Sequence, residues 1–303
     1  MKSFKKIVFL LMVLGAQKAF AQQEFMVTHY MFNGLALNPA YAGVHEGISL
    51  SFLYRNQWVG FEGAPNTQLA SIHSPINGRP ISLGAIFFRD ELGLSTEHGG
   101  YFSYAYRIQV DMNLKLSMGL QFSTHNYQIK YSRAENGVFD PGDNLADINE
   151  FKWNFGSGLM LHNDRFFIGV SVPQILDRKL DVNDPDGNFS KLIRHYYGYI
   201  GYAFNINQDL ILKPNVLVKS VENAPVQIDL NANALIKNIL WVGISYRSLD
   251  SIDGIVGFQI TPQMQFSYAT DFTLTEINNQ SHEVMLNYVF SFPTKKILTP
   301  RYF

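Results

Sequence analysis

Large apolar residues alternate with small or polar residues along most of this chain. The clearest example is Leu114 to Ser123, where every second residue from Leu114 to Phe122 is large and apolar. Because successive side chains of a β-strand point to opposite faces, such a run forms a strand with one apolar and one polar face. Similar runs fill the chain and leave almost no room for helices. The alternation therefore predicts an all-β protein.

The same pattern predicts about fourteen strands. The expected strands cover residues 47–58, 66–75, 81–90, 97–108, 113–128, 152–162, 165–174, 193–204, 209–218, 226–236, 239–247, 252–260, 264–273 and 282–292. The faces opposite the apolar ones carry polar residues such as Asp229, Asn231 and Glu283. Apolar side chains outside and polar side chains inside suit a barrel that is surrounded by lipid.

The lengths of the connections give an independent indication. Links after even-numbered strands are short, whereas two links after odd-numbered strands, 129–151 and 175–192, are long. Outer-membrane barrels have short periplasmic turns, longer extracellular loops and an even strand number. We therefore expect a transmembrane antiparallel outer-membrane β-barrel. The alternative, a soluble β-sandwich or barrel, is disfavoured by the chain's length and by the Tyr and Trp residues at strand ends.

The first residues have the features of a cleavable secretory signal. Lysines precede a short apolar stretch at 7–15, and Ala19-Phe20-Ala21 matches an A-x-A cleavage site. The apolar stretch is shorter than the roughly 20 residues that a membrane-spanning helix needs. We expect a signal peptide at 1–21, an N-terminal periplasmic or plug segment at 22–46, a barrel at 47–292 and a tail at 293–303.

Composition agrees with an exported membrane barrel. The chain contains 24 Phe and 16 Tyr residues, which suits an aromatic-rich barrel surface. It has no cysteine, and therefore neither a lipid-attachment cysteine nor a disulfide. Removal of the signal would leave 20 basic and 25 acidic residues, which argues against nucleic acid as a partner. The expected location is the outer membrane of a Gram-negative cell.

Several short motifs, spread from the N-terminal segment to the chain end, point to a family. They are Phe32-Asn33, Leu37-Asn38-Pro39-Ala40-Tyr41-Ala42-Gly43, Tyr54-Arg55-Asn56-Gln57-Trp58, Pro65, Gln68, Ser71, His73-Ser74-Pro75, Asp90, Gly93, Trp241-Val242-Gly243, Tyr246-Arg247, Ser281-His282-Glu283 and Pro300-Arg301-Tyr302-Phe303. In these motifs the chain resembles the PorP/SprF family of type IX secretion system outer-membrane proteins of Bacteroidetes. The resemblance spans the whole mature sequence.

The resemblance implies a barrel that works beside the secretion and gliding machinery. It would bind or anchor the C-terminal domain of a secreted adhesin or other type IX substrate, or periplasmic secretion-ring components, with membrane lipid and lipopolysaccharide around the barrel. Neither catalytic residues nor a cofactor come with it. Contact surfaces are expected at 33–43 and at the two long loops, although 33–43 equally suits a cap at the barrel base. The expected partner-binding residues are Asn33, Asn38, Pro39, Tyr41, Gly43, Arg55 and Trp58.

Other functions rest on weaker signals. Ser71 with His73 and Ser123 with His125 pair a nucleophile with a base, but no nucleophile-elbow motif surrounds them, so an enzyme is not expected. The acidic run at 181–187 fails the ligand pattern of a calcium loop, so no metal site is expected. A channel similar to FadL is the alternative function, because the Asn-Pro-Ala segment before this barrel resembles the N-terminal plug that gates FadL-type channels. The mainly polar inward faces suit water or a peptide better than an acyl chain.

Overall fold

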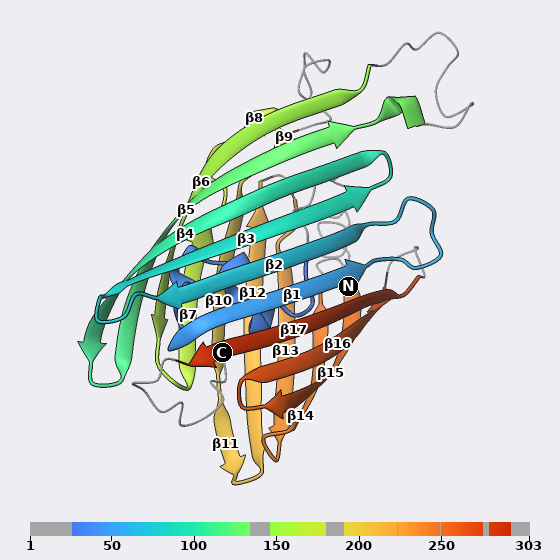
Figure 1. Ribbon diagram of the computed structural model, residues 1–303. Helices are drawn as coiled ribbons and strands as arrows, with labels where there is room; N and C mark the ends of the chain where they lie inside the picture. Colours follow the sequence, from blue (N-terminus) through green and yellow to red (C-terminus); the bar gives the residue numbers. More distant parts are fainter. Residues whose placement is uncertain are drawn as a thin grey trace, which may run out of the picture.

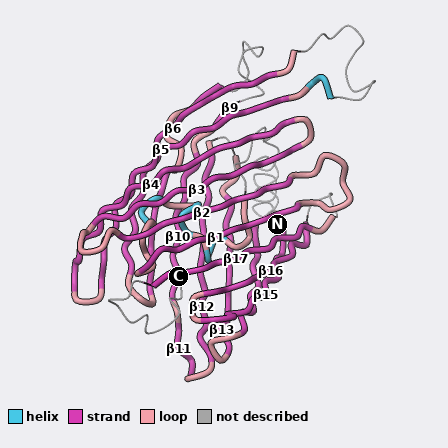
Figure 2. Tube along the Cα trace, in the orientation of Figure 1, coloured by secondary structure: helices cyan, strands magenta, loops and turns pink. Residues whose placement is uncertain are grey.

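The computed structural model describes residues 26–133, 146–179, 191–222, 224–248, 250–274 and 279–291. In this part of the chain nearly all regular structure is strand, and the helical residues form only short 3₁₀ turns (Figure 2). No helix among the described residues is both long enough and apolar enough to cross a membrane. The predicted signal peptide, the C-terminal tail and the acidic run at 181–187 lie outside the described residues.

Fourteen wall strands form one closed antiparallel sheet (Figure 1). They are β1 (Gly47–Asn56), β2 (Asn66–Pro75), β3 (Ile81–Leu92), β4 (Ser95–Asp111), β5 (Leu114–Ile129), β6 (Ile148–His162), β7 (Phe166–Val172), β10 (His195–Tyr202) continued by β11 (Phe204–Asn207), β12 (Leu210–Val221), β13 (Gln227–Ile236), β14 (Leu240–Arg247), β15 (Ser251–Thr261), β16 (Met264–Thr273) and β17 (Ser281–Ser291). Each wall strand pairs with the next along the chain, and β1 pairs with β17 to close the barrel. The predicted fold class is confirmed.

Strand boundaries differ from prediction in a few places. Strand β4 extends over 95–111 instead of 97–108, and β7 ends at Val172. The long connection after β7 also contains a small ribbon of β8 (Arg178–Lys179) and β9 (Lys191–Leu192), which was not predicted. Two-residue strands are too short to produce a period-2 pattern, so the sequence gives no signal for them.

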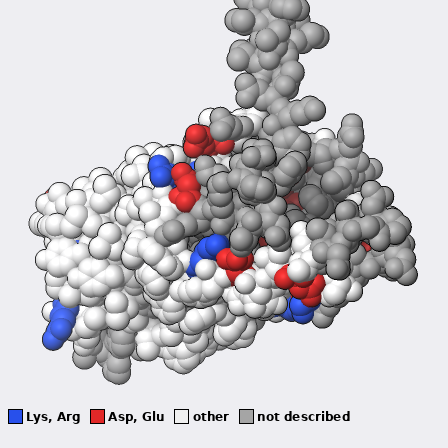
Figure 3. Space-filling model, turned by 90° about the horizontal axis from the view of Figure 1, so that it is seen from above, with Lys and Arg blue, Asp and Glu red and all other residues white. Residues whose placement is uncertain are grey.

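The burial of side chains follows the alternation of the sequence. In β5, outward-facing Leu120 is 63% exposed, whereas neighbouring Gln121 faces the lumen and is 4% exposed. Charged side chains are sparse on the face seen in Figure 3, with large uncharged areas between them. The wall is therefore apolar toward lipid and polar toward the lumen. The short turns, such as 112–113 and 163–165, lie at the end that we assign to the periplasm.

The N-terminal segment lies inside the barrel. Residues 26–46, called the plug from here on, contain the 3₁₀ turns η1 (Tyr30–Phe32), η2 (Gly34–Ala36) and η3 (Pro39–Tyr41), and most of these residues are buried while the rest are half-buried. The plug leads into β1 at the periplasmic end, and its other end reaches strand residues near the long loops. This position is consistent with the predicted N-terminal periplasmic or plug segment, and the segment extends through the lumen beyond the barrel base.

Candidate functional site

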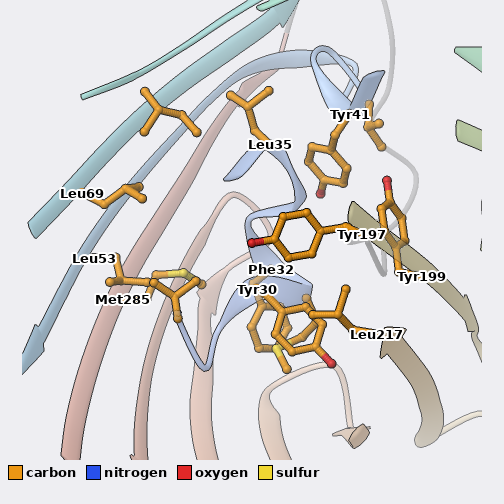
Figure 4. Close-up of a cluster of buried hydrophobic side chains, with 14 of the residues drawn as sticks. Tyr30, Phe32, Leu35, Tyr41, Leu53, Leu69, Tyr197, Tyr199, Leu217 and Met285 are labelled. Carbon is orange, nitrogen blue, oxygen red and sulfur yellow. The ribbon is translucent and has the colours of Figure 1, made fainter. Parts of the chain in front are cut away.

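Apolar side chains of the plug fill the space between opposite walls of the barrel. Tyr30, Phe32 and Leu35 project from the plug between side chains of β1, β2 and β17 on one side and of β10 and β12 on the other (Figure 4). Phe32 also packs edge-on against Trp241 of β14, with ring centroids 5.3 Å apart. Leu35 is only 1% exposed. The plug therefore completes a hydrophobic core in the lumen, to which buried apolar residues of the wall such as Leu53, Leu69 and Leu217 also contribute.

A buried ionic network joins the start of the plug to three wall strands. The carboxylate of Glu283 in β17 accepts hydrogen bonds from the backbone N–H groups of Thr28 and His29, both at 2.8 Å. The imidazole Nδ1 of His29 lies 2.6 Å from Oε1 of the same carboxylate. Arg55 of β1 donates to Glu283 at 3.0 Å and to Asp271 of β16 at 2.5 Å. Thr28 Oγ1 also donates to Asp271, at 2.8 Å. The guanidinium thus neutralises both carboxylates while they hold the plug.

A second ionic cluster lies on the wall facing Tyr30. Arg247 of β14 contacts Asp229 of β13 at 3.1 Å and Asp253 of β15 at 3.7 Å. The Tyr30 hydroxyl donates to the side-chain oxygen of Asn215 at 2.9 Å. Burial in the lumen raises the pKa of the Tyr30 hydroxyl far above its usual value. The hydroxyl therefore stays protonated and keeps its role as a hydrogen-bond donor.

Asn38 attaches the middle of the plug to the barrel backbone. Its side-chain amide donates to the carbonyl oxygens of Leu159 in β6 and Val170 in β7, at 3.1 and 3.2 Å. Its Oδ1 accepts from the backbone N–H of Ala40 at 2.8 Å and caps η3. This approach requires a glycine in the wall, because a Cβ at Gly158 would lie 2.0 Å from Asn38 Oδ1.

Two further wall residues shape the seat of η3. A Cβ at Gly119 of β5 would lie 2.2 Å from the backbone nitrogen of Ala40, so the plug backbone rests directly on the wall backbone. Ser171 of β7 donates to the carbonyl of Leu37 at 2.6 Å. Small residues in adjacent strands therefore allow a close backbone contact that larger side chains would prevent.

The periplasmic end of the plug is held by polar contacts to its backbone. The N–H of Gly43 donates to His73 of β2 at 3.1 Å, and Arg107 of β4 donates to the carbonyls of Ala42 and Gly43 at 3.1 and 2.9 Å. Gly43 has φ of +71°, a left-handed conformation that favours glycine. Tyr41 packs edge-on against His73, with ring centroids 5.6 Å apart. The plug thus ends in a tight turn before β1.

Six of the seven expected partner-binding residues lie inside the barrel. Asn33, Asn38, Pro39, Tyr41, Gly43 and Arg55 are all buried. Asn33 donates to Ser71 of β2 at 3.2 Å, Pro39 begins η3, and the other four make the contacts described above. Trp58 instead follows β1 in the connection 57–65 and is partly exposed. Its backbone N–H donates to the Ser281 hydroxyl at 3.3 Å. Five of the buried residues belong to the plug, and Arg55 binds the plug. The six residues therefore lie together in the barrel lumen, but they do not form an exposed surface for a partner.

Ser123 and His125 line up with Glu97 in the order of a catalytic triad. His125 Nε2 lies 3.2 Å from Ser123 Oγ, and its Nδ1 lies 2.7 Å from Glu97 Oε1. Ser123 and His125 are fully buried, so a substrate cannot reach the hydroxyl in this conformation. The group satisfies its own polar atoms inside the wall. Within the described residues, no cluster of three or more His, Cys, Asp or Glu side chains has the arrangement of a metal site.

The family model for "Type IX secretion system membrane protein PorP/SprF" matches residues 19–288. The chain belongs to this family. The resemblance found in the sequence motifs is thereby confirmed, and the protein is an outer-membrane barrel component of type IX secretion. No curated protein matches the chain significantly.

Solved structures with similar folds are distant in sequence. The CymD monoaromatic hydrocarbon channel shares 13% identity at a TM-score of 0.54, over 86% of this chain and 92% of CymD. The Ralstonia pickettii toluene transporter TbuX shares 12% identity at a TM-score of 0.50, over 86% of this chain and 93% of TbuX. At such identities the likeness establishes the barrel fold and leaves function to be argued from the site.

Proposed function

We propose that this family member is a closed outer-membrane anchor that binds a protein partner. The partner is the C-terminal domain of a secreted adhesin or a periplasmic component of the secretion and gliding machinery. The observation that carries this proposal is the plug, which fills the lumen and is bonded to opposite parts of the wall at both ends and in the middle. A barrel with such an interior offers its two ends, rather than its lumen, to other molecules.

Two sets of surfaces are available to a partner under this proposal. The connection containing Trp58 and the loops 129–151 and 175–192 belong to the end opposite the short turns. The periplasmic end presents the last plug residues beside the turns 112–113 and 163–165. Asn33, Asn38, Pro39, Tyr41, Gly43 and Arg55 support partner binding by holding the plug in place. Export through cleavage after Ala21 would deliver the barrel to this location.

The test is a crosslinked pull-down of the tagged full chain from outer membranes, followed by mass spectrometry of the attached proteins. We expect a secreted protein's C-terminal domain or secretion-ring components. A variant lacking 134–145 should still fold, because surface loops tolerate large length changes. If the loop is the docking site, this variant loses the partner while keeping a folded barrel. Recovery of the barrel without any protein partner would contradict the anchor proposal.

A channel is the second candidate, and the fold likeness to CymD and TbuX supports it. Those proteins are described as a hydrocarbon channel and a toluene transporter. For this chain a channel would require a path past the plug, whose contacts include backbone lying directly on backbone at Gly119. The two functions differ in whether the unmodified barrel passes solutes.

A further inference from the structure

The outer face of the wall carries an apolar groove far larger than the small cavities around the plug. It has a volume of about 830 Å³ and lies across β4, β5, β6, β7, β10 and β12. The side chains that bound it and matter here are Leu120, Leu159, Val170, Val172, Tyr196 and Val218. The volume falls in the range of about 300–1,000 Å³ that is typical of small-molecule binding sites. We call this feature the outer groove.

The outer groove exists because three outward positions carry little or no side chain. They are Ser157 in β6, Gly198 in β10 and Ser220 in β12. Gly198 stands opposite Val170 on one neighbouring strand and Val218 on the other. A Cβ added at Gly198 would meet no atom within 4 Å, so the protein itself leaves this space open.

One end of the outer groove reaches the rim with the long loops. Tyr196 is the second residue of β10 and follows the connection from β7. The Arg194 guanidinium is 35% exposed and donates to the Tyr196 hydroxyl at 3.3 Å and to the carbonyl of Ile175 at 2.8 Å. Asp177 lies 3.8 Å from it. A partly exposed arginine therefore stands at the extracellular end of an apolar groove.

We propose that the outer groove binds acyl chains of lipopolysaccharide, with a lipid A phosphate at Arg194. The groove is continuous with the lipid-facing wall, so hydrocarbon chains are its immediate surroundings. Its apolar lining matches an acyl chain, and a guanidinium is well suited to a phosphate. The arginine lies at the extracellular rim, where the leaflet contains lipopolysaccharide. This position selects lipopolysaccharide over a phospholipid of the inner leaflet.

The outer groove and the plug share the same wall backbone. Leu159 and Val170 direct their side chains into the groove, while their carbonyl oxygens accept the hydrogen bonds of Asn38 from the lumen side. An acyl chain in the groove would therefore pack against the part of the wall that holds the middle of the plug. Lipid binding itself does not depend on the proposed anchor function.

The test uses the purified full-length protein in mixed micelles that contain equimolar lipid A and phosphatidylethanolamine, with bound lipid counted by native mass spectrometry. Wild-type protein should carry lipid A in preference. Gly198→Phe places a ring in the groove at a position where an added Cβ meets no atom within 4 Å. It should lower the lipid A-bound fraction by about tenfold, because the ring takes the place of buried hydrocarbon. Arg194→Gln should lower lipid A binding without changing phosphatidylethanolamine binding.

The matched control is Gly254→Phe in β15. Gly254 also faces outward, with its nearest side-chain atom 4.0 Å from an added Cβ, but it lies outside the groove. The Gly254→Phe variant should retain lipid A at the wild-type level. Heat-dependent gel mobility checks that both glycine variants fold. Equal lipid A retention by both glycine variants, or a preference for phosphatidylethanolamine, would overturn the proposal. The proposal would also be overturned if the wild-type protein were a dimer with or without lipid and Gly198→Phe converted it to a monomer. In that case the groove would be an interface between two copies of the chain.

Discussion

Individual charged residues in the lumen matter because they are buried together. Arg55, Asp271 and Glu283 are each no more than 2% exposed, and the Arg55 guanidinium pairs with both carboxylates. Replacing one partner of a buried ion pair leaves an uncompensated charge, which is far more costly than losing a pair at the surface. The pair of Arg89 and Glu91 in β3 is such a surface pair, with side chains 42% and 37% exposed.

At the scale of one residue, Arg55→Leu should destabilise the barrel by about 3–5 kcal/mol, because Asp271 and Glu283 lose their shared cation. Arg89→Leu is the control and should cost about 0–1 kcal/mol. The measurement is urea-induced unfolding of the refolded protein in detergent micelles, followed by tryptophan fluorescence. Equal shifts for the two variants would show that the buried network contributes no more than a surface pair.

The site's residues differ in how far sequence could identify them. Arg55 and Asn38 were singled out from the family motifs, and both proved to hold the plug. Their partners were not identified, since Asp271 and Glu283 lie 216 and 228 positions from Arg55 along the chain. Only the pairing of β1 with β17 and the closure of the barrel bring them together. A motif marks a residue, but its partners follow from strand register.

Among the structural elements, the strands were predictable with their approximate bounds, whereas the N-terminal plug segment was predictable only as a segment and not in its path or contacts. Wall strands repeat apolar and polar positions with a period of two, because lipid lies on one side and the lumen on the other. The plug is surrounded by protein on all sides, so its sequence shows no such period. Pro39 excludes a regular strand or a helix interior at its position but does not define the path of the segment. The close contact of the plug with the wall depends on Gly119 and Gly158, because a side chain at either position would clash with the plug.

At the scale of the plug, Asn38→Ala should loosen the whole segment from the wall. The variant loses the cap of η3 and two hydrogen bonds to barrel carbonyls, together about 2–4 kcal/mol. Hydrogen exchange of amides in 37–44 should accelerate by roughly 30- to 1,000-fold if it follows local opening of the plug. Mass spectrometry of peptides from the exchanged protein measures this.

The control for the plug is Asn66→Ala, which removes a hydrogen bond of 2.7 Å to the Tyr54 hydroxyl at the exposed end of β2. It should leave exchange in 37–44 unchanged. If Asn38→Ala also left it unchanged, then apolar packing alone would hold the plug, and the polar contacts through Gly158 would have no role in its attachment.

For the whole molecule, closure of the sheet and filling of the lumen act together. Pairing of β1 with β17 removes the open edges that a membrane would not tolerate, and the plug packs with apolar residues of the inner wall into one core. The result is a closed barrel whose interior is occupied by its own N-terminal segment. In a type IX secretion family member, this architecture supports our proposal of an anchor that holds a partner at its ends.

The most direct test of this view is the ion conductance of the purified full chain in a planar lipid bilayer. Wild-type protein should insert without producing steady conductance steps, because the plug blocks the lumen. Gly119→Trp, which places a large side chain where Ala40 now rests on the wall, should displace the plug and produce steps that confirm insertion. Steady conductance by the unmodified protein would contradict a closed anchor and favour the channel.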